Sequence, residues 1–257
     1  QPLFRKFVHY TPENHEKIKK MMDGDDCVEF FIHETDLIRY YKDFRIKTLS
    51  DALKNGESPK KVLKSAYLLN EQILKEYFEN IGSSRILRTL ENLISVIQDC
   101  LAQGKLEFID VFLITRKDDH SYTHCTNTGM YCMALANKLK MKPEAVREIG
   151  LGGMLFSIGK KSIPYDVIIK EGELTPEEFQ LIRKLPSGSR KILNDMKCYS
   201  DNILKMALEH REKFDGTGYP FQMKGEKISL YARVVSIMDV FGALTAARPT
   251  RTALTPF

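Results

Sequence analysis

The sequence predicts a mainly α-helical protein, with a helical bundle at its C-terminal end, a helical hairpin before it and a small α/β unit at the start. From about residue 105 onward, apolar residues recur at helical spacing almost without interruption, and two long amphipathic segments precede this region. Only the first 48 residues mix short alternating runs with helical ones. We therefore expect an N-terminal module over residues 1–48, a helical linker over 49–104 and the bundle over 105–257.

The N-terminal module contains signals for both kinds of secondary structure. Thr11 and Pro12 suit the start of a helix, because threonine can cap the first turn and proline is favoured just inside it. The apolar run 27–32 predicts a strand, and residues 36–44 predict a second helix. Acidic residues at 23–26 lack the alternating ligands of a calcium-binding loop, so we interpret them as a polar turn. A sensory or regulatory role is expected for this module.

The linker predicts two antiparallel helices. The first begins at Ser58-Pro59 and carries apolar residues at helical spacing as far as Tyr77. Residues 81–84 interrupt it, and a second amphipathic helix ends at Gln103-Gly104. The pair is interpreted as a connector, a dimerisation surface or the first part of the bundle.

The remainder of the chain predicts a succession of helices. The last helix before the Gly- and Pro-rich stretch is expected to stop near Phe214, because the following Asp215-Gly216 pair breaks helices. Helices are expected over residues 107–115, 121–140, 143–156, 175–185, 188–195, 201–213 and 230–244.

Composition and charge exclude several classes of protein. Of the 257 residues 43% are hydrophobic, which is enough for a sizeable core, but no run approaches the roughly 18 apolar residues of a membrane helix. The net charge is only +5, and the basic residues are interspersed with acidic ones along the chain. We therefore expect no groove that binds nucleic acid. The first residues show no signal-peptide pattern, and five cysteines without a C-x-x-C pair predict free thiols in a reducing cytoplasm. Cys125 and Cys132 are expected to be buried small hydrophobic residues.

Several motifs follow one another in the helical region. His120 and His124 lie one turn apart at the entry to a long helix, as the two histidines of a metal site on one helix do. His210 lies at the end of another helix, before a rigid loop that contains Asp-Gly-Thr-Gly-Tyr-Pro at 215–220. Further motifs are Leu-Gly-Gly-Met-Leu-Phe-Ser-Ile-Gly-Lys at 151–160, Leu-Thr-Pro-Glu-Glu at 174–178, Pro-x-Gly-x-x-x-Ile-Leu at 186–193, Ala-Arg-Val-x-x-Ile-x-Asp-x-Phe-x-Ala-Leu-Thr at 232–245 and Arg-Pro-Thr-Arg at 248–251.

With these motifs in this order, the chain resembles the HD-GYP domain family of bacterial cyclic di-GMP phosphodiesterases over about residues 107–257. The motif at 215–220 is the most specific of them. The resemblance implies an HD-GYP-type helical bundle with two or three metal ions, usually iron or manganese. Histidines and carboxylates on several helices would be the ligands. In such a site a metal-activated water attacks a phosphodiester.

The sequence departs from the family at the residues that would hold the metals. Where the resemblance places the His-Asp dyad, this chain has Phe156-Ser157, and Leu185 stands where a ligand histidine would precede Pro186. Arg211 replaces the second of two adjacent histidines. Phenylalanine and leucine cannot bind a metal, and we expect them to fill the vacated volume.

The family's ligand positions that remain are His124, His210 and Asp239, and His120 is near a position where some members have a glutamate ligand. One hypothesis is that Arg211 pairs with Asp239 and supplies the positive charge that a metal centre would supply. A second is a residual mononuclear site made of the four remaining residues. In a third interpretation, His124 is a hydrogen-bonded core residue and His120 a surface one.

Residues that would hold a dinucleotide rather than cleave it are retained. The resemblance implies phosphate contacts for Lys160, Arg248 and Arg251, whose alternative role is a surface salt bridge. Tyr219 belongs to a loop that the family associates with the rim of the active site and with contacts to partner proteins.

The first hypothesis for function is therefore a degenerate HD-GYP regulator in bacterial cyclic di-GMP signalling. It would be a pseudoenzyme without a bound cofactor, acting through protein contacts, through dinucleotide binding, or through both. The second is an active phosphodiesterase or phosphohydrolase with a reduced iron or manganese site. The third is a structural module whose N-terminal unit carries the sensing. A homodimer is left open, and no membrane association is expected.

Overall fold

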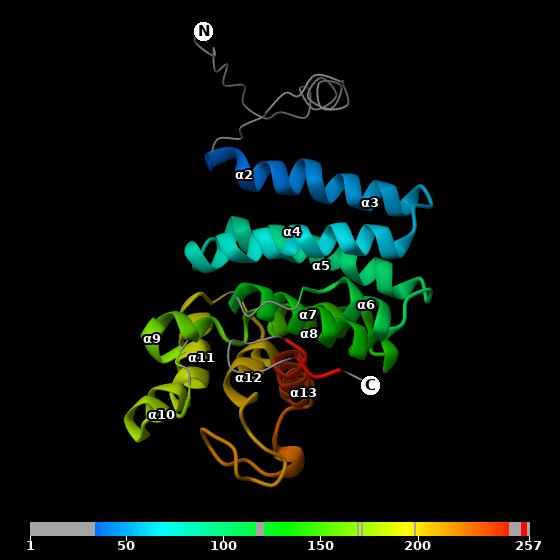
Figure 1. The fold of residues 1–257 in the computed structure, drawn as a ribbon. Coiled ribbons are helices and arrows are strands. Elements are labelled where there is room, and N and C mark those ends of the chain that lie inside the picture. Colours follow the sequence, from blue (N-terminus) through cyan, green and yellow to red (C-terminus); the bar gives the residue numbers. More distant parts are fainter. Residues whose placement is uncertain are drawn as a thin grey trace.

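The computed structural model describes residues 34–116, 121–168, 170, 172–197, 199–246 and 253–255. The strand predicted at 27–32 lies outside these residues, as do His120, Arg248 and Arg251. Every regular element in the described part of the chain is a helix, which confirms the predicted mainly α-helical class. The helices lie in successive layers from the N-terminal end to the C-terminal end (Figure 1).

The first layer is a helical run with a change of winding in its middle. It consists of α2 (Glu34–Tyr40), the π-helical η1 (Tyr41–Ile46) and α3 (Lys47–Lys54). The predicted helix at 36–44 lies within this run, and α3 crosses the predicted module boundary at 48/49. The division of the chain into modules stays a prediction.

The predicted hairpin forms the second layer. It consists of α4 (Pro59–Glu79) and α5 (Ser84–Ala102), whose apolar faces are buried in a core shared with the bundle. The Tyr67 hydroxyl of α4 accepts a hydrogen bond from the Arg116 amide at 2.9 Å and lies 3.0 Å from Asn127 Oδ1. The hairpin is therefore packed against the bundle, as its interpretation as the first part of the next domain requires.

The bundle is formed by the remaining helices. Its elements are α6 (Phe108–Ile114), α7 (Ser121–Lys138), α8 (Pro143–Leu155), η2 (Ile158–Ser162), α9 (Tyr165–Ile168), α10 (Pro176–Arg183), α11 (Leu185–Asp195), α12 (Asp201–Glu209), η3 (Gly225–Lys227) and α13 (Leu230–Thr245). The short elements α9, η2 and η3 were not predicted, because a segment of three to five residues is too short to show a helical periodicity.

Helices α7 and α8 approach each other closely. A Cβ atom on Gly153 of α8 would lie 3.0 Å from the Cα atom of Gly129 on α7. Only glycines at this crossing allow the two backbones to come so near. The crossing fixes the position of His124, which precedes it on α7, relative to Phe156 at the end of α8.

Helix α12 ends earlier than predicted. It stops at Glu209 rather than at residue 213, because the ring of His210 takes over the carbonyls at the end of the helix. His210 Nδ1 lies 3.2 Å from the Met206 carbonyl oxygen and 3.0 Å from that of Ala207. These contacts give carbonyls of the last helical turn a side-chain partner where the chain leaves the helix.

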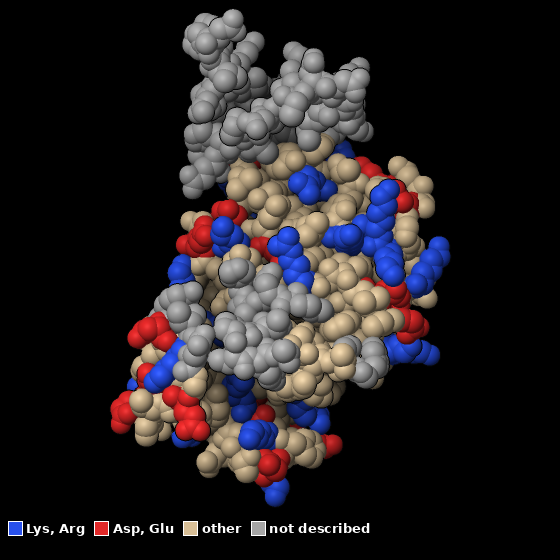
Figure 2. All heavy atoms as spheres, viewed as in Figure 1, with Lys and Arg blue, Asp and Glu red and all other residues tan. Residues whose placement is uncertain are grey.

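Other predictions concern cysteines, membranes and charge. Cys100, Cys125 and Cys132 are buried free thiols, as expected, whereas Cys27 and Cys198 lie outside the described residues. In the described part of the chain, no helix has the length and apolar character needed to span a bilayer. Basic and acidic residues are interspersed over the face drawn in Figure 2.

Candidate functional site

Residues from four helices meet at one buried place in the bundle. His124 comes from α7, Phe156 follows α8, His210 follows α12 and Asp239 lies on α13. All four are almost fully buried. Arg211 reaches this cluster from the loop after α12 and keeps 37% of its side chain exposed. The sequence-predicted residues therefore come together although they are far apart in the chain.

Asp239 is the centre of this site. Its Oδ1 accepts a hydrogen bond from His124 Nε2 at 2.8 Å, and its Oδ2 lies 3.2 Å from Arg211 Nη2. Burial alone would raise the pKa of the Asp239 carboxyl, but the hydrogen bond from His124 and the charge of Arg211 lower it below its usual range. Asp239 is thus held as a buried carboxylate with a partner on each oxygen. The predicted ion pair between Arg211 and Asp239 is confirmed.

His210 is enclosed rather than free to bind. The ring of Phe156 meets its ring edge-on, with the centroids 4.8 Å apart. Since Nδ1 donates to the backbone carbonyls of α12, the lone pair is on Nε2, which is buried without a hydrogen-bond partner among the described residues. Burial, and next the charge of Arg211, lowers the pKa of His210 from 6.5 to about 4. The ring is therefore neutral at physiological pH.

Ser157 and Leu185 are structural in this arrangement. The Ser157 hydroxyl lies 3.1 Å from Cys125 Sγ, and both groups are buried. Leu185 is buried at the start of α11, and its carbonyl oxygen is 2.9 Å from where a Cβ atom on Gly159 would lie. Gly159 also donates its amide to Ser189 Oγ at 2.9 Å. These contacts hold η2 and α11 together beneath the site.

The sequence matches the HD domain family over residues 112–257. The chain belongs to this family. Its fold is similar to that of a solved structure, Bd1817, an HDG"Y"P protein from Bdellovibrio bacteriovorus. The alignment with that structure covers 83% of this chain and 70% of the Bd1817 chain, with a TM-score of 0.67. Because the two sequences are 19% identical, this similarity shows the fold alone.

Curated relatives of this chain are bacterial phosphodiesterases. It is 39% identical over 132 residues to the cyclic di-GMP phosphodiesterase PA4108 of Pseudomonas aeruginosa, covering 51% of this chain and 32% of that protein. It is 32% identical over 139 residues to the 3'3'-cGAMP-specific phosphodiesterase 1 of Vibrio cholerae, covering 54% of this chain and 32% of that protein. The chain thus spans about a third of the length of these relatives.

HD domains normally use a metal, but the described residues of this chain do not fit one. No three His, Cys, Asp or Glu side chains among them gather as a metal-binding group. His124 and Asp239 are hydrogen-bonded to each other, and the guanidinium of Arg211 forms an ion pair with the Asp239 carboxylate. Phe156 fills the space beside His210. A cation added here would meet a fixed positive charge and too few free donors.

Of the predicted dinucleotide contacts, the structure describes Lys160 and Tyr219. Lys160 is half-buried on η2; burial raises the pKa of the Cys125 thiol to about 11, and the charge of Lys160 acts in the opposite direction. Tyr219 is half-buried, and burial raises the pKa of its hydroxyl, which Arg211 and Asp239 also influence. Both residues are therefore close enough to the buried cluster for an electrostatic interaction with it.

A residue that the sequence did not single out fixes the loop after His210. Glu212 is 4% exposed, and its carboxylate accepts the amides of Phe221 at 2.6 Å and Met223 at 2.9 Å. The sequence feature that could have identified Glu212 is its position just before a stretch rich in glycine and proline. The backbone amides of such a loop need hydrogen-bond acceptors, and a carboxylate can supply two. Asp215 closes a smaller turn by accepting the Thr217 amide at 2.8 Å.

Proposed function

We propose that this chain is a regulatory HD-GYP protein in bacterial cyclic di-GMP signalling that does not hydrolyse the dinucleotide. The observation that carries this proposal is the Arg211–Asp239 ion pair at 3.2 Å. Hydrolysis in a site of this kind needs an activated water placed against phosphorus. Here the guanidinium takes the carboxylate that would help to hold the activating metal, and Phe156 closes the space next to His210.

A regulator without turnover acts through what it binds. Lys160 and Tyr219 are close enough to the buried cluster for an electrostatic interaction with it, and cationic and aromatic side chains suit the phosphates and bases of a cyclic dinucleotide. We include Arg248 and Arg251 in the proposed phosphate contacts. We also propose that the Gly-Tyr-Pro loop contacts a protein partner and that the protein works in the cytoplasm, where its buried free thiols stay reduced.

Metal analysis, dinucleotide titration and turnover on one preparation test this function. The chain is incubated with Fe²⁺ or Mn²⁺, freed of excess metal, and assayed for bound metal and for linearised cyclic di-GMP. We expect neither stoichiometric metal nor product, together with binding that Lys160→Met weakens and that the exposed Lys75→Met on α4 leaves unchanged. Tightly bound metal with linear product would overturn the proposal. Absence of any dinucleotide binding would reduce it to protein contacts alone.

One observation favours an active phosphodiesterase with a reduced metal site as the alternative. His210 Nε2 is buried without a partner among the described residues, and an orphaned lone pair of this kind is suited to a metal. In that case turnover would require Asp239, and Asp239→Asn would abolish it together with metal binding. The same measurements therefore separate the two functions.

A further inference from the structure

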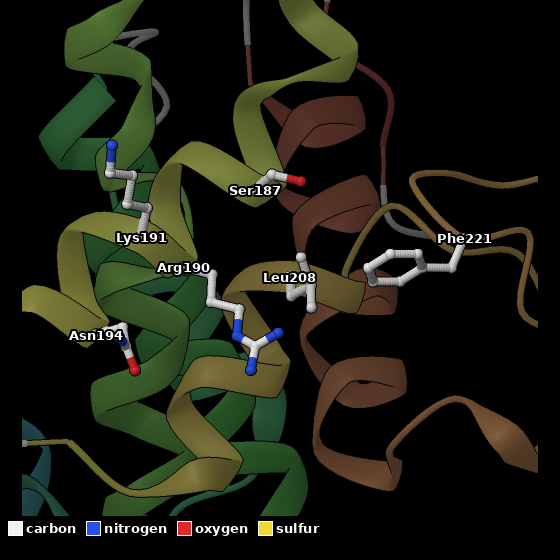
Figure 3. Close-up of a pocket in the computed structure, with 6 residues that line it drawn as sticks. All are labelled: Ser187, Arg190, Lys191, Asn194, Leu208 and Phe221. Carbon is white, nitrogen blue, oxygen red and sulfur yellow. The ribbon is translucent and has the colours of Figure 1, made fainter.

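A second site lies on the surface, apart from the buried cluster. It is a shallow pocket of about 290 Å³ between α11, α12 and the loop that follows the Tyr219–Pro220 bond. Leu208 forms its floor, with the Arg190 side chain on one side and the ring of Phe221 on the other (Figure 3). Its lining residues are Ser187, Arg190, Lys191, Asn194, Leu208 and Phe221.

The loop that carries Phe221 is held in place by its backbone. The Glu212 carboxylate, itself buried, binds the amides of Phe221 and Met223. A Cβ atom on Gly218 would lie 2.3 Å from the Lys213 nitrogen, so the loop packs directly against the chain after α12. Such a loop lowers the cost of ordering the backbone on binding.

Two large aromatic side chains project from this fixed loop. Phe221 is 62% exposed and Phe214 is 61% exposed. Phe214 is tied to the other arm of the loop, because its carbonyl accepts the Gly225 amide at 2.9 Å. Aromatic residues that stay exposed on a preorganised backbone, next to a concave surface, are typical of protein-binding sites.

The charge beside these aromatic residues is positive. Arg190 and Lys191 are exposed, and neither forms an ion pair with any residue that the structure describes. The Asp201 carboxylate is near enough for the charge of Arg190 to act on it, but it is already paired with Lys205 at 2.7 Å. No acidic residue is among the described residues that line the pocket. A partner that carries carboxylates is therefore complementary to it.

We propose that this pocket binds an acidic segment of a partner protein. One apolar side chain of the segment lies on Leu208 against the ring of Phe221, and a neighbouring carboxylate pairs with the Arg190 guanidinium. Lys191 points away from Phe221 and contributes only long-range attraction (Figure 3). The inference rests on the proposed regulatory function, since a chain that does not hydrolyse its ligand acts through its contacts. The pocket is small and open, which suits one anchoring side chain.

Peptide display with the full chain tests this proposal. A random library of twelve-residue peptides is selected on the wild-type chain and depleted on the Phe221→Ser variant, and the surviving peptides are measured by fluorescence anisotropy. We expect them to be rich in Asp and Glu around a single apolar residue. Phe221→Ser and Arg190→Glu should each weaken binding by about tenfold or more, and Lys191→Glu by less.

Matched variants keep the result specific. Ile237→Ser removes an equally exposed apolar side chain from α13, and Lys75→Glu inverts an exposed charge on α4; both should leave binding unchanged. The proposal is overturned if no peptide depends on both Phe221 and Arg190, if the dependent peptides are basic, or if a single-stranded oligonucleotide competes in their place. Turnover of cyclic di-GMP by the same preparation would contradict the regulatory function and leave the peptide result standing.

Discussion

The Arg211 guanidinium lies 3.2 Å from one carboxylate oxygen of Asp239, and His124 donates to the other oxygen from 2.8 Å. A buried carboxylate with a cation on one side and an imidazole on the other is satisfied within the chain itself. This arrangement links the stability of the bundle to the residues of the buried cluster.

Removal of the guanidinium should destabilise the fold. Arg211→Met leaves Asp239 with His124 alone, and because Arg211 is partly exposed we expect a loss of about 1–3 kcal/mol in the free energy of unfolding. Urea denaturation followed by circular dichroism measures it. Lys213→Met, two residues further along on an exposed position, should change it by less than about 0.5 kcal/mol. Equal effects of the two changes would contradict a structural role for the ion pair.

Rebuilding the dyad should not restore a metal by itself. In the Phe156→His, Ser157→Asp variant, Arg211 still occupies the Asp239 carboxylate, so we expect metal content to stay at the wild-type level. Adding Arg211→His removes the fixed cation and supplies another donor, and metal content should then rise. Elemental analysis after dialysis against Mn²⁺ measures the metal content of the double and the triple variant.

An increase in the double variant alone would show that Arg211 does not block the site. Arg183→His in place of Arg211→His is the matched control, because its guanidinium lies over the ring of Tyr219, 5.7 Å from the ring centroid, and does not pair with Asp239. This control should not raise metal content.

The metal-free protein should lose stability in mildly acidic solution because of His210. Its pKa is about 4 in the folded chain and about 6.5 when unfolded, so only the unfolded chain takes up the proton between these values. The stabilisation is complete above pH 6.5 and is lost as the pH falls towards 4, by at most about 1.4 kcal/mol per pH unit. Unfolding in the presence of a chelator, compared between wild type and His210→Gln, isolates this contribution. Parallel curves for the two proteins would refute it.

Glu212 should control the order of the loop. Glu212→Gln removes the charge that binds the amides of Phe221 and Met223, and one of these amides loses its acceptor. We expect a loss of about 1–3 kcal/mol in local stability, seen as faster hydrogen exchange at residues 218–223. Glu226→Gln changes an exposed carboxylate on the same loop and should leave the exchange unaltered. Unchanged protection in Glu212→Gln would show that the loop is held by other contacts.

The helical class, the extents of α4 and α5, and the family all follow from the amino-acid sequence alone. These features depend on local periodicity, on breakers such as those at 81–84, and on short motifs read along the chain. The sequence also indicated that Phe156, Leu185 and Arg211 replace potential ligands. That inference depends on the family resemblance for the positions, and on the inability of phenylalanine and leucine to bind a metal.

The contacts that these residues make depend on the fold. The contact between Arg211 and Asp239, and the enclosure of His210 by Phe156, join segments from different helices, and nothing in their spacing along the chain reveals the distances. The early end of α12 has the same origin, because the His210 ring competes for the helix carbonyls. Glu212 and the pocket beside Phe221 became visible for the same reason: burial and exposure depend on which segments pack together.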